Sequence, residues 1–392
     1  MRIAVFIKST TFNAGYGGLE TQNKVLCEGL AERGHEVVVF SPAKDGKYAT
    51  QTQDNVTYVF VPCVYRMLFA SLNKNNWYHK SYQEFIKHHN QKPFDAAISQ
   101  SSAGLGLIKR KSGLPIRIVG ASHGTIGGEM KTVINSAKNP LVLAKSAKSL
   151  IFGLINFFGR QRQYIHGCQT IVAVSSAVKE SIINETFAPA EKIIVIHNGL
   201  DGSKIPQKDW RAADNKQPFK IIYIGRIEEA KGLRELLLAC KELAGVFVNI
   251  VGDGPFLGEL KTICRQHKMS QKVLFYGKLP FEKAIEIYAC NDVLVLPTKR
   301  VEGLPMTLVE ACFAGLPIIT TDVGGNKDVV EDGATGFLLT KLTVDTLKEK
   351  LVQLAANRRL AETMGTNGRI KAETEFTLQK MLTSYEKVLC GS

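Results

Sequence analysis

Two glutamates with seven residues between them, Glu302 and Glu310, are the side chains in this sequence best placed for chemistry. The apolar run Val293–Leu296 before them predicts a buried parallel strand, and the apolar spacing from Leu304 to Ala314 predicts a helix. Glu302 would then lie in a loop at the carboxyl end of a strand, where open α/β sheets bind ligands. Glu310 would lie about two turns into the helix, so the two form no close acid pair unless the loop folds back. The alternative is a solvated loop carboxylate and a surface helix carboxylate.

Two cations, Arg226 and Lys231, follow another predicted strand, Lys220–Ile224. The guanidinium of Arg226 can form a fork of hydrogen bonds to a phosphate, and Lys231 adds a compact charge at the start of the next helix. We therefore expect phosphate binding at this strand end. The alternative is two surface cations, one of them paired with Glu228 or Glu229.

A glycine pair, Gly17 and Gly18, follows the first predicted strand and precedes a helix. Glycines there let backbone N–H groups approach an anion at the helix N-terminus, where the helix dipole adds to the attraction. The dinucleotide fingerprint GxGxxG is incomplete, because Glu20 stands where its third glycine would be. A loop with a purely conformational role is equally consistent with the pattern.

A single histidine, His123, follows the predicted strand Ile116–Ala121 and precedes a glycine. Its place at a strand end predicts that it faces the ligand-binding edge of the sheet. A structural histidine is the alternative.

The sequence lacks the motifs of several enzyme classes. It contains no DxD, which argues against a carboxylate pair holding Mg²⁺ on a diphosphate, and no GxxxxGK[ST], GxSxG or HExxH. Its eight cysteines are scattered, with no CxxC and no Cys/His cluster, so neither a disulfide framework nor a zinc site is expected. No apolar run approaches the ~20 residues of a spanning helix. We expect a cytoplasmic protein that requires no metal and no cofactor.

Predicted strands alternate with predicted helices along both halves of the chain. In the first half the strands are Arg2–Ile7, Val37–Phe40, Val56–Val61, Ala96–Ser99, Ile116–Ala121, Thr170–Val174 and Ile193–Ile196, with helices at Leu19–Arg33 and Ser176–Asn184. In the second half the strands are Lys220–Ile224, Phe247–Val251, Val273–Tyr276, Val293–Leu296 and Ile318–Thr320, with helices around 232–243, 256–267, 281–289 and 304–314. Three helices are expected over Thr343–Leu389. This alternation is typical of doubly wound parallel sheets.

The pattern divides the chain into two Rossmann-like domains, residues 1–200 and 219–375. Residues 201–218 are polar, contain two prolines and show no clear periodicity, so we interpret them as the linker.

The net charge of +14 belongs mostly to the first half, where residues 1–200 hold 23 Lys/Arg against 12 Asp/Glu. Residues 130–179 contain seven basic residues and no acid. Such a field attracts phosphate in lipid head groups, nucleotides or nucleic acid.

Seven segments, in sequence order, resemble the retaining glycosyltransferases of family 4, which have the GT-B fold. They are GGLE at 17–20, SHG at 122–124, VSSAVKE at 174–180, HNGLD at 197–201, GRIEEAKG at 225–232, GDGP at 252–255 and EGLPMTLVE at 302–310. The last is the E-x7-E element of that family and the most specific of the set. The resemblance covers essentially the whole chain. It implies an acceptor-binding domain and a nucleotide-sugar-binding domain that face each other across a nucleotide-sugar cleft, with a final helix, residues 376–392, that crosses back to the first domain.

The resemblance also implies how the diphosphate of a sugar nucleotide is held. Arg226 and Lys231 would bind it in place of a metal ion. Gly17 and Gly18 would approach the same diphosphate from the other domain.

The remaining roles implied by the resemblance concern the two sugars of the donor. Glu310 would accept hydrogen bonds from the ribose hydroxyls. Glu302, with the backbone N–H groups of Gly303 and Leu304, would hold the hydroxyls of the transferred sugar. His123 would contact that sugar near the reacting carbon.

Residues 126–168 are the part least similar to the family. Lys131, Lys138 and Lys145 recur every seven residues, which in a helix places them on roughly one face, and Lys148 lies close by. With the apolar residues that follow, this segment predicts contact with an anionic membrane surface and delivery of a lipid-linked acceptor. The alternative is an ordinary helix packed on the first domain.

The sequence thus predicts a metal-independent retaining glycosyltransferase, a hexosyl- or N-acetylhexosaminyltransferase. The expected donor is a nucleotide sugar, UDP-linked by default with GDP close behind, and the expected acceptor is a glycan or a polyprenyl- or other lipid-linked molecule. Cell-surface polysaccharide synthesis on the inner face of the plasma membrane is the expected setting. The alternatives are a GT-B phosphorylase, a sugar-nucleotide epimerase, or a basic nucleic-acid-binding protein. We expect no nucleic-acid partner, because aromatic and basic residues do not interleave as on a stacking surface.

Overall fold

The computed structural model describes the chain except residues 15–16, 65–73, 137–155, 211–216 and 392. The chain forms two compact units. The first consists of Met1–Gly127, Ala147–Asn198 and Leu378–Ser392, and the second of Gly128–Ser146 and Gly199–Thr377.

The first unit contains an eight-stranded sheet in the order β3-β4-β2-β1-β5-β6-β7-β8. Its strands are β1 (Arg2–Phe6), β2 (Glu36–Pro42), β3 (Ala49–Gln53), β4 (Val56–Val61), β5 (Ala96–Gln100), β6 (Arg117–Ser122), β7 (Thr170–Ala173) and β8 (Ile193–Val195). All neighbouring strands are parallel except β3 and β4, which are antiparallel. The parallel strands are apolar runs because both of their faces are covered.

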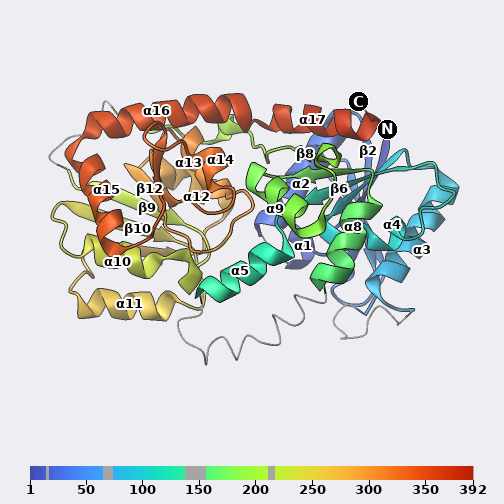
Figure 1. Ribbon diagram of the computed structural model, residues 1–392, viewed down its shortest axis with the longest axis horizontal. Coiled ribbons are helices and arrows are strands. Elements are labelled where there is room, and N and C mark those ends of the chain that lie inside the picture. Colours follow the sequence, from blue (N-terminus) through green and yellow to red (C-terminus); the bar gives the residue numbers. More distant parts are fainter. Residues whose placement is uncertain (15–16, 65–73, 137–155, 211–216, 392) are drawn as a thin grey trace. The chain divides into compact units, whose positions relative to one another are not determined.

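The second unit contains a six-stranded parallel sheet in the order β11-β10-β9-β12-β13-β14 (Figure 1). Its strands are β9 (Phe219–Ile224), β10 (Val246–Val251), β11 (Val273–Gly277), β12 (Val293–Leu296), β13 (Ile318–Thr321) and β14 (Gly336–Leu339).

Helices connect the strands of both sheets. In the first half of the chain they are α1 (Thr11–Ala14), α2 (Gly18–Glu32), α3 (Trp77–Gln91), α4 (Leu105–Ile108), α5 (Ile126–Ser136), α8 (Arg162–Gly167) and α9 (Ser176–Thr186). In the second half they are α10 (Leu233–Cys240), α11 (Leu257–Gln266), α12 (Phe281–Tyr288), α13 (Met306–Phe313), α14 (Asn326–Val329), α15 (Val344–Ala356), α16 (Arg358–Glu375) and α17 (Leu378–Cys390).

Each sheet has one point where the order of its strands reverses. In the first sheet β1 lies between β2 and β5, and in the second sheet β9 lies between β10 and β12. The connections therefore leave these central strands toward opposite sides, which opens a crevice at their carboxyl ends. The loops after β1 and β5, and those after β9 and β12, are the ones that such a crevice presents to a ligand.

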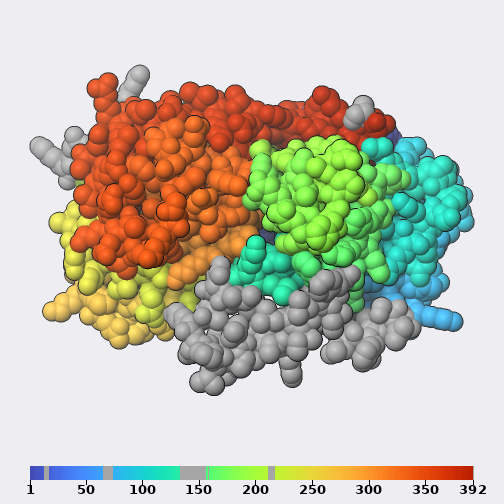
Figure 2. Space-filling model, viewed as in Figure 1, coloured from blue at the N-terminus to red at the C-terminus, as the bar shows by residue number. Residues whose placement is uncertain are grey.

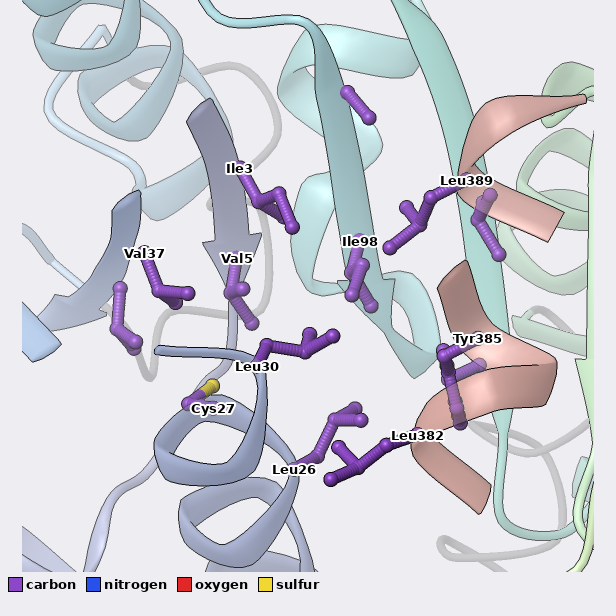
Figure 3. Packing of buried hydrophobic residues seen from close by; sticks show 14 of the residues in the cluster. Ile3, Val5, Leu26, Cys27, Leu30, Val37, Ile98, Leu382, Tyr385 and Leu389 are labelled. Atoms are coloured by element: carbon purple, nitrogen blue, oxygen red, sulfur yellow. The ribbon is translucent and has the colours of Figure 1, made fainter. Parts of the chain in front are cut away.

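Helix α17, at the end of the chain, belongs to the first unit. Leu382 of α17 points toward Leu26 of α2, and Tyr385 and Leu389 of α17 join the same buried cluster as Ile98 of β5 (Figure 3). Residues of α17 therefore pack in the same hydrophobic core as residues of β1.

Most strands predicted from the sequence occur within one or two residues of the predicted bounds. Two were missed. Strand β3 is mostly exposed and polar, so it has no apolar alternation, and β14 is only four residues long. The first sheet is consequently not wholly parallel, because β3 folds back on β4.

The described part of the stretch expected to be a linker packs on the second unit. Ile205 is buried, the backbone N–H of Lys208 donates to Ala314 O at 2.8 Å, and the indole of Trp210 donates to Gly315 O at 3.2 Å. These contacts reach α13 and the turn after it, which no local pattern in residues 201–218 reveals.

Replacing Leu382 by alanine should destabilise the first unit by about 2–4 kcal/mol, because the buried side chain lies tightly against Gly29 of α2. A Trp210→Phe background leaves Trp77, which is buried in the first unit, as the single tryptophan of the chain. Urea unfolding followed by its fluorescence measures the change.

The matched control is Val352→Ala on α15, whose side chain is 44% exposed and which should change stability by less than about 0.5 kcal/mol. Equal effects of the two truncations would contradict the role assigned to α17.

Candidate functional site

The loops after β9 and β12 bring Lys231 and Glu302 together. Their strands are neighbours, with Val293 opposite Ile221. Lys231 Nζ lies 2.5 Å from Glu302 Oε1, and the hydroxyl of Thr298 donates to the same oxygen at 3.1 Å. Both charged side chains are about 15% exposed (15% and 14%). An ion pair that keeps contact with solvent at a strand-order reversal is suited to binding a polar ligand.

This pairing depends on two loops that touch backbone to backbone. Gly232, which follows Lys231, has φ +71°, and a Cβ there would lie 1.9 Å from Pro297 O. The N–H of Lys299 also donates to Ala230 O at 2.7 Å. Any side chain at position 232 would therefore push the Lys231 loop away from Glu302.

The backbone of Glu302 is fixed from its other side by the loop after β13. Gly325 N–H donates to Glu302 O at 2.9 Å, and a Cβ on Gly324, which has φ +58°, would lie 2.1 Å from that same oxygen. Glu302 is therefore held in place by loops from three successive strands of the sheet.

Backbone donors lie next to Glu302. Among the described residues, none accepts a hydrogen bond from the N–H groups of Gly303 or Leu304. These groups precede α13, where the helix dipole favours electronegative partners.

Arg226 lies at the same strand end, with its side chain 76% exposed. Its guanidinium contacts Glu228 Oε1 at 2.7 Å, and its carbonyl accepts a hydrogen bond from the buried Tyr223 hydroxyl at 2.7 Å. The pairing with Glu228, which the sequence left as an alternative, is therefore present. An exposed pair of this kind contributes little stability, so a phosphate can replace or share the carboxylate at small cost.

Glu310 has a different partner from Glu302. Its Oε2 accepts a hydrogen bond from the Tyr288 hydroxyl at 2.7 Å. No described residue donates to its Oε1. Desolvation raises the pKa of Glu310, and the hydrogen bond from Tyr288 opposes that rise. The two glutamates thus form no acid pair. Glu302 contacts Lys231, whereas Glu310 accepts a hydrogen bond from Tyr288.

In the first unit, the glycine pair stands at the start of α2. A Cβ on Gly17 would lie 2.3 Å from Glu20 Oε2, whereas a Cβ on Gly18 would meet nothing within 4 Å. The hydroxyl of Ser9 donates to Glu20 Oε1. Glu20 therefore supplies negative charge at this helix N-terminus, and an anion must displace it to bind there.

His123 follows β6 and has a partner that the sequence did not suggest. Its Nε2 lies 2.8 Å from Oε1 of Gln100, the last residue of the neighbouring strand β5. Burial lowers the pKa of His123 to about 4, so the ring is neutral and donates through Nε2. Gln100 could have been found only by pairing β5 with β6.

A second group missed by the sequence fixes the loop after His123. Glu185, on α9, accepts hydrogen bonds from Thr125 Oγ1 at 2.7 Å, Gly127 N at 3.2 Å and Gln161 Nε2 at 2.7 Å. Helix α9 and the loop after it are at the surface in Figure 2 (light green). A carboxylate placed at the N-terminus of α5 in this way stabilises the start of that helix.

Of the lysines predicted to meet a membrane, Lys131 is exposed on α5. Lys138, Lys145 and Lys148 lie outside the described residues. In the part of the chain that the structure describes, no helix is long and apolar enough to cross a membrane, and no group of three or more His, Cys, Asp or Glu could hold a metal ion.

Two family models match this chain in succession. The model described as Glycosyltransferase Family 4 matches residues 16–204, and the model described as Glycosyl transferases group 1 matches residues 204–371. A capsular polysaccharide biosynthesis glycosyltransferase of Staphylococcus aureus, CapM, is 31% identical over 232 residues, which cover 54% of this chain and 59% of CapM. The chain thus matches less than two thirds of that relative's length.

Two solved structures are similar over the full length of both chains, at 17% identity each. Sucrose-phosphate synthase from Thermosynechococcus elongatus superposes with a TM-score of 0.79. Anabaena HepE, in complex with UDP and glucose, superposes with a TM-score of 0.77.

The lowered pKa of His123 predicts a pH effect on stability. Its ordinary pKa is 6.5, so below pH 6.5 the unfolded chain binds a proton that the folded chain refuses until about pH 4. Stability should therefore fall as pH decreases through this range. His123→Asn should reduce the difference in urea stability between pH 7 and pH 5.

The ring can also be observed directly by NMR of labelled histidine, where His123 should titrate with a midpoint near 4. A midpoint near 6.5 would show that the ring is solvated and that its bond to Gln100 does not hold it neutral.

Proposed function

The chain belongs to the glycosyltransferases of family 4, which have the GT-B fold, and from this premise we propose that it transfers a sugar from a nucleotide-sugar donor to a glycan or lipid-linked acceptor. The observation that carries the proposal is the ion pair of Lys231 and Glu302 beside the exposed Arg226, at the reversal of strand order in the second sheet. The two cations, Arg226 and Lys231, suit the diphosphate end of a nucleotide sugar. The carboxylate of Glu302 suits the hydroxyls of its sugar end.

In this proposal the two cations hold the donor diphosphate without a metal ion. Arg226 can turn from Glu228 to the phosphates, and Lys231 can bind a phosphate oxygen while it keeps Glu302, because its ammonium has three donors. Glu302 and the N–H groups of Gly303 and Leu304 would hold the hydroxyls of the transferred sugar. The unoccupied Oε1 of Glu310 would accept from the ribose.

The chemistry follows from this placement. The bond between the anomeric carbon and the diphosphate breaks, which leaves an oxocarbenium-like sugar and extra negative charge on the leaving group. Cations fixed at that position stabilise the transition state more than the ground state. The acceptor oxygen forms its new bond from the leaving-group side, which retains the configuration, and its proton passes to the departing phosphate oxygen. Glu302 is then a holder of hydroxyls and forms no covalent bond to the sugar.

Two similar proteins support a proposal for the donor base and for the pathway in which the chain acts. HepE was crystallised with UDP and glucose, and CapM acts in capsular polysaccharide biosynthesis. We therefore propose a UDP-linked hexose or N-acetylhexosamine donor and a role in cell-surface polysaccharide synthesis.

The proposal is tested by thermal stabilisation with UDP, GDP, ADP and their common sugar conjugates. A true donor should raise the melting temperature in proportion to its affinity. Glu310→Gln should weaken binding of the stabilising nucleotide about tenfold, because a ribose acceptor is lost. Glu302→Ala should mainly lower turnover.

The matched control for Glu310→Gln is Glu259→Gln, an exposed carboxylate on α11 paired with Arg234. A transferase should release nucleoside diphosphate only when an acceptor is present. A phosphorylase or an epimerase should show no such dependence on a sugar acceptor. A flat response to every nucleotide would refute the donor site.

We further propose that residues 126–168, with Lys131, Lys138, Lys145 and Lys148, hold the protein on anionic membranes. The exposed Lys131 on α5 and the seven basic residues of the acid-free stretch 130–179 support this proposal. In a flotation assay the protein should bind vesicles that contain about 30% phosphatidylglycerol. Added salt should release it, because salt screens the charges. Lys131→Glu should reduce flotation, whereas Lys261→Glu, at an exposed position of α11, should not. Equal binding to neutral vesicles would contradict the proposal.

A further inference from the structure

Two cations meet one aromatic ring where strand order reverses in the first sheet. Lys8 follows β1, and its Nζ lies 5.8 Å from the centroid of the Tyr78 ring on α3. Arg160, in the single turn Phe157–Gln161, places its guanidinium carbon 5.7 Å from the centroid of the same ring. Neither residue was singled out by the sequence.

These cations lack the carboxylate partner that two other cations over aromatic rings have. Arg2 over Phe94 also contacts Glu36, and Lys208 over Trp210 also contacts Asp292. Among the described residues, by contrast, no carboxylate oxygen lies within the 4.0 Å of an ion pair from Lys8 or Arg160. Two cations that share one ring without an anion leave unbalanced positive charge at this edge of the sheet.

Hydrogen bonds hold the surrounding loop, which adds the hydroxyl of Ser102 to the site. Lys8 Nζ donates to Ser102 Oγ at 3.1 Å, just after β5. The backbone at Ser101 has φ +50°, a left-handed conformation that is strained for serine. The indole of Trp77 holds the loop by donating to Ala103 O at 2.8 Å. Strained backbone of this kind, held in place by its surroundings, is common at ligand-binding sites.

Lys8 contacts the loop next to Gln100, the partner of the histidine that the family resemblance places near the reacting sugar carbon. Gln100 ends β5, binds His123 at 2.8 Å, and lies two residues before Ser102. Lys8 and His123 follow β1 and β6, the two strands that flank β5, so a group bound at Lys8 would lie at the same edge of the sheet as His123.

We propose that Lys8, Arg160 and Ser102 bind a phosphate or diphosphate group of the acceptor, with Tyr78 as the aromatic wall of the site. This inference rests on the proposed transfer function and adds the chemical class of the acceptor, a phosphorylated one. Two cations at one ring, with a hydroxyl in contact with Lys8, match a doubly charged phosphate, and the fork of Arg160 adds geometric selection. The phosphate can belong to a soluble sugar phosphate or to a lipid diphosphate.

The test is calorimetric titration with glucose 6-phosphate and with farnesyl diphosphate, in the presence of saturating UDP so that the donor diphosphate site is filled. At least one probe should bind. Lys8→Gln and Arg160→Gln should each weaken its binding at least about tenfold. Preference for farnesyl diphosphate identifies a lipid-linked acceptor, and preference for glucose 6-phosphate identifies a soluble one.

The matched control is Arg110→Gln. Arg110 also lies over a tyrosine ring, 5.3 Å from the centroid of Tyr82, but it is exposed and its guanidinium donates to Gly106 O at 3.2 Å. It should leave binding within about twofold of the original. Absence of binding by both probes, unchanged binding in the Lys8 and Arg160 variants, or an equal loss in Arg110→Gln would overturn the inference.

The UDP titration of the same variants separates this inference from the proposed function. Lys8→Gln and Arg160→Gln should bind UDP as the parent does, which also shows that they are folded. If the parent binds none of the nucleotides UDP, GDP and ADP, the proposed function fails, and the two probes titrated without nucleotide still decide whether Lys8 and Arg160 form an anion site.

Discussion

The close backbone approach of the loops after β9 and β12 is the constraint on which the second unit's site depends. Position 232 must be glycine because Pro297 O occupies the space of a side chain, and this contact sets Lys231 against Glu302. The ion pair is thus a consequence of packing between two parallel strands. Because both side chains remain partly exposed, neither charge of the pair is fully buried.

In the first unit, too, polar side chains from neighbouring strands meet at the carboxyl edge of the sheet. Lys8 follows its central strand β1, Gln100 ends β5, and His123 follows β6. Lys8 donates to Ser102, which lies two residues after Gln100, and Gln100 accepts from His123. Burial keeps His123 neutral. A neutral ring can donate a hydrogen bond through Nε2 without adding positive charge at this edge of the sheet.

Helix α17 explains how the last residues of the chain matter to the first unit. Its apolar face completes the buried cluster over β1 and β5, the strands whose ends carry Lys8 and Gln100. Arg33 and His35 add polar contacts to Glu386 at its surface, at 2.6 and 3.0 Å. The stability of the first sheet therefore depends on residues far from its first strand in the sequence. Met381 of α17, for example, contacts Gln22 of α2, which is 359 positions away.

The sequence by itself determined the alternation of strands and helices, the strand ends that carry Arg226, Lys231 and Glu302, and the resemblance that the family models confirm. These features are local, since apolar periodicity and short motifs need only neighbouring residues. The tertiary structure alone decided that Glu302 pairs with Lys231 and Glu310 with Tyr288, that Gln100 holds His123, that Glu185 caps α5, and that Lys8 and Arg160 share one ring. Each of these contacts joins residues at least 20 positions apart, and the order of strands in a sheet, which places them side by side, leaves no trace in local sequence.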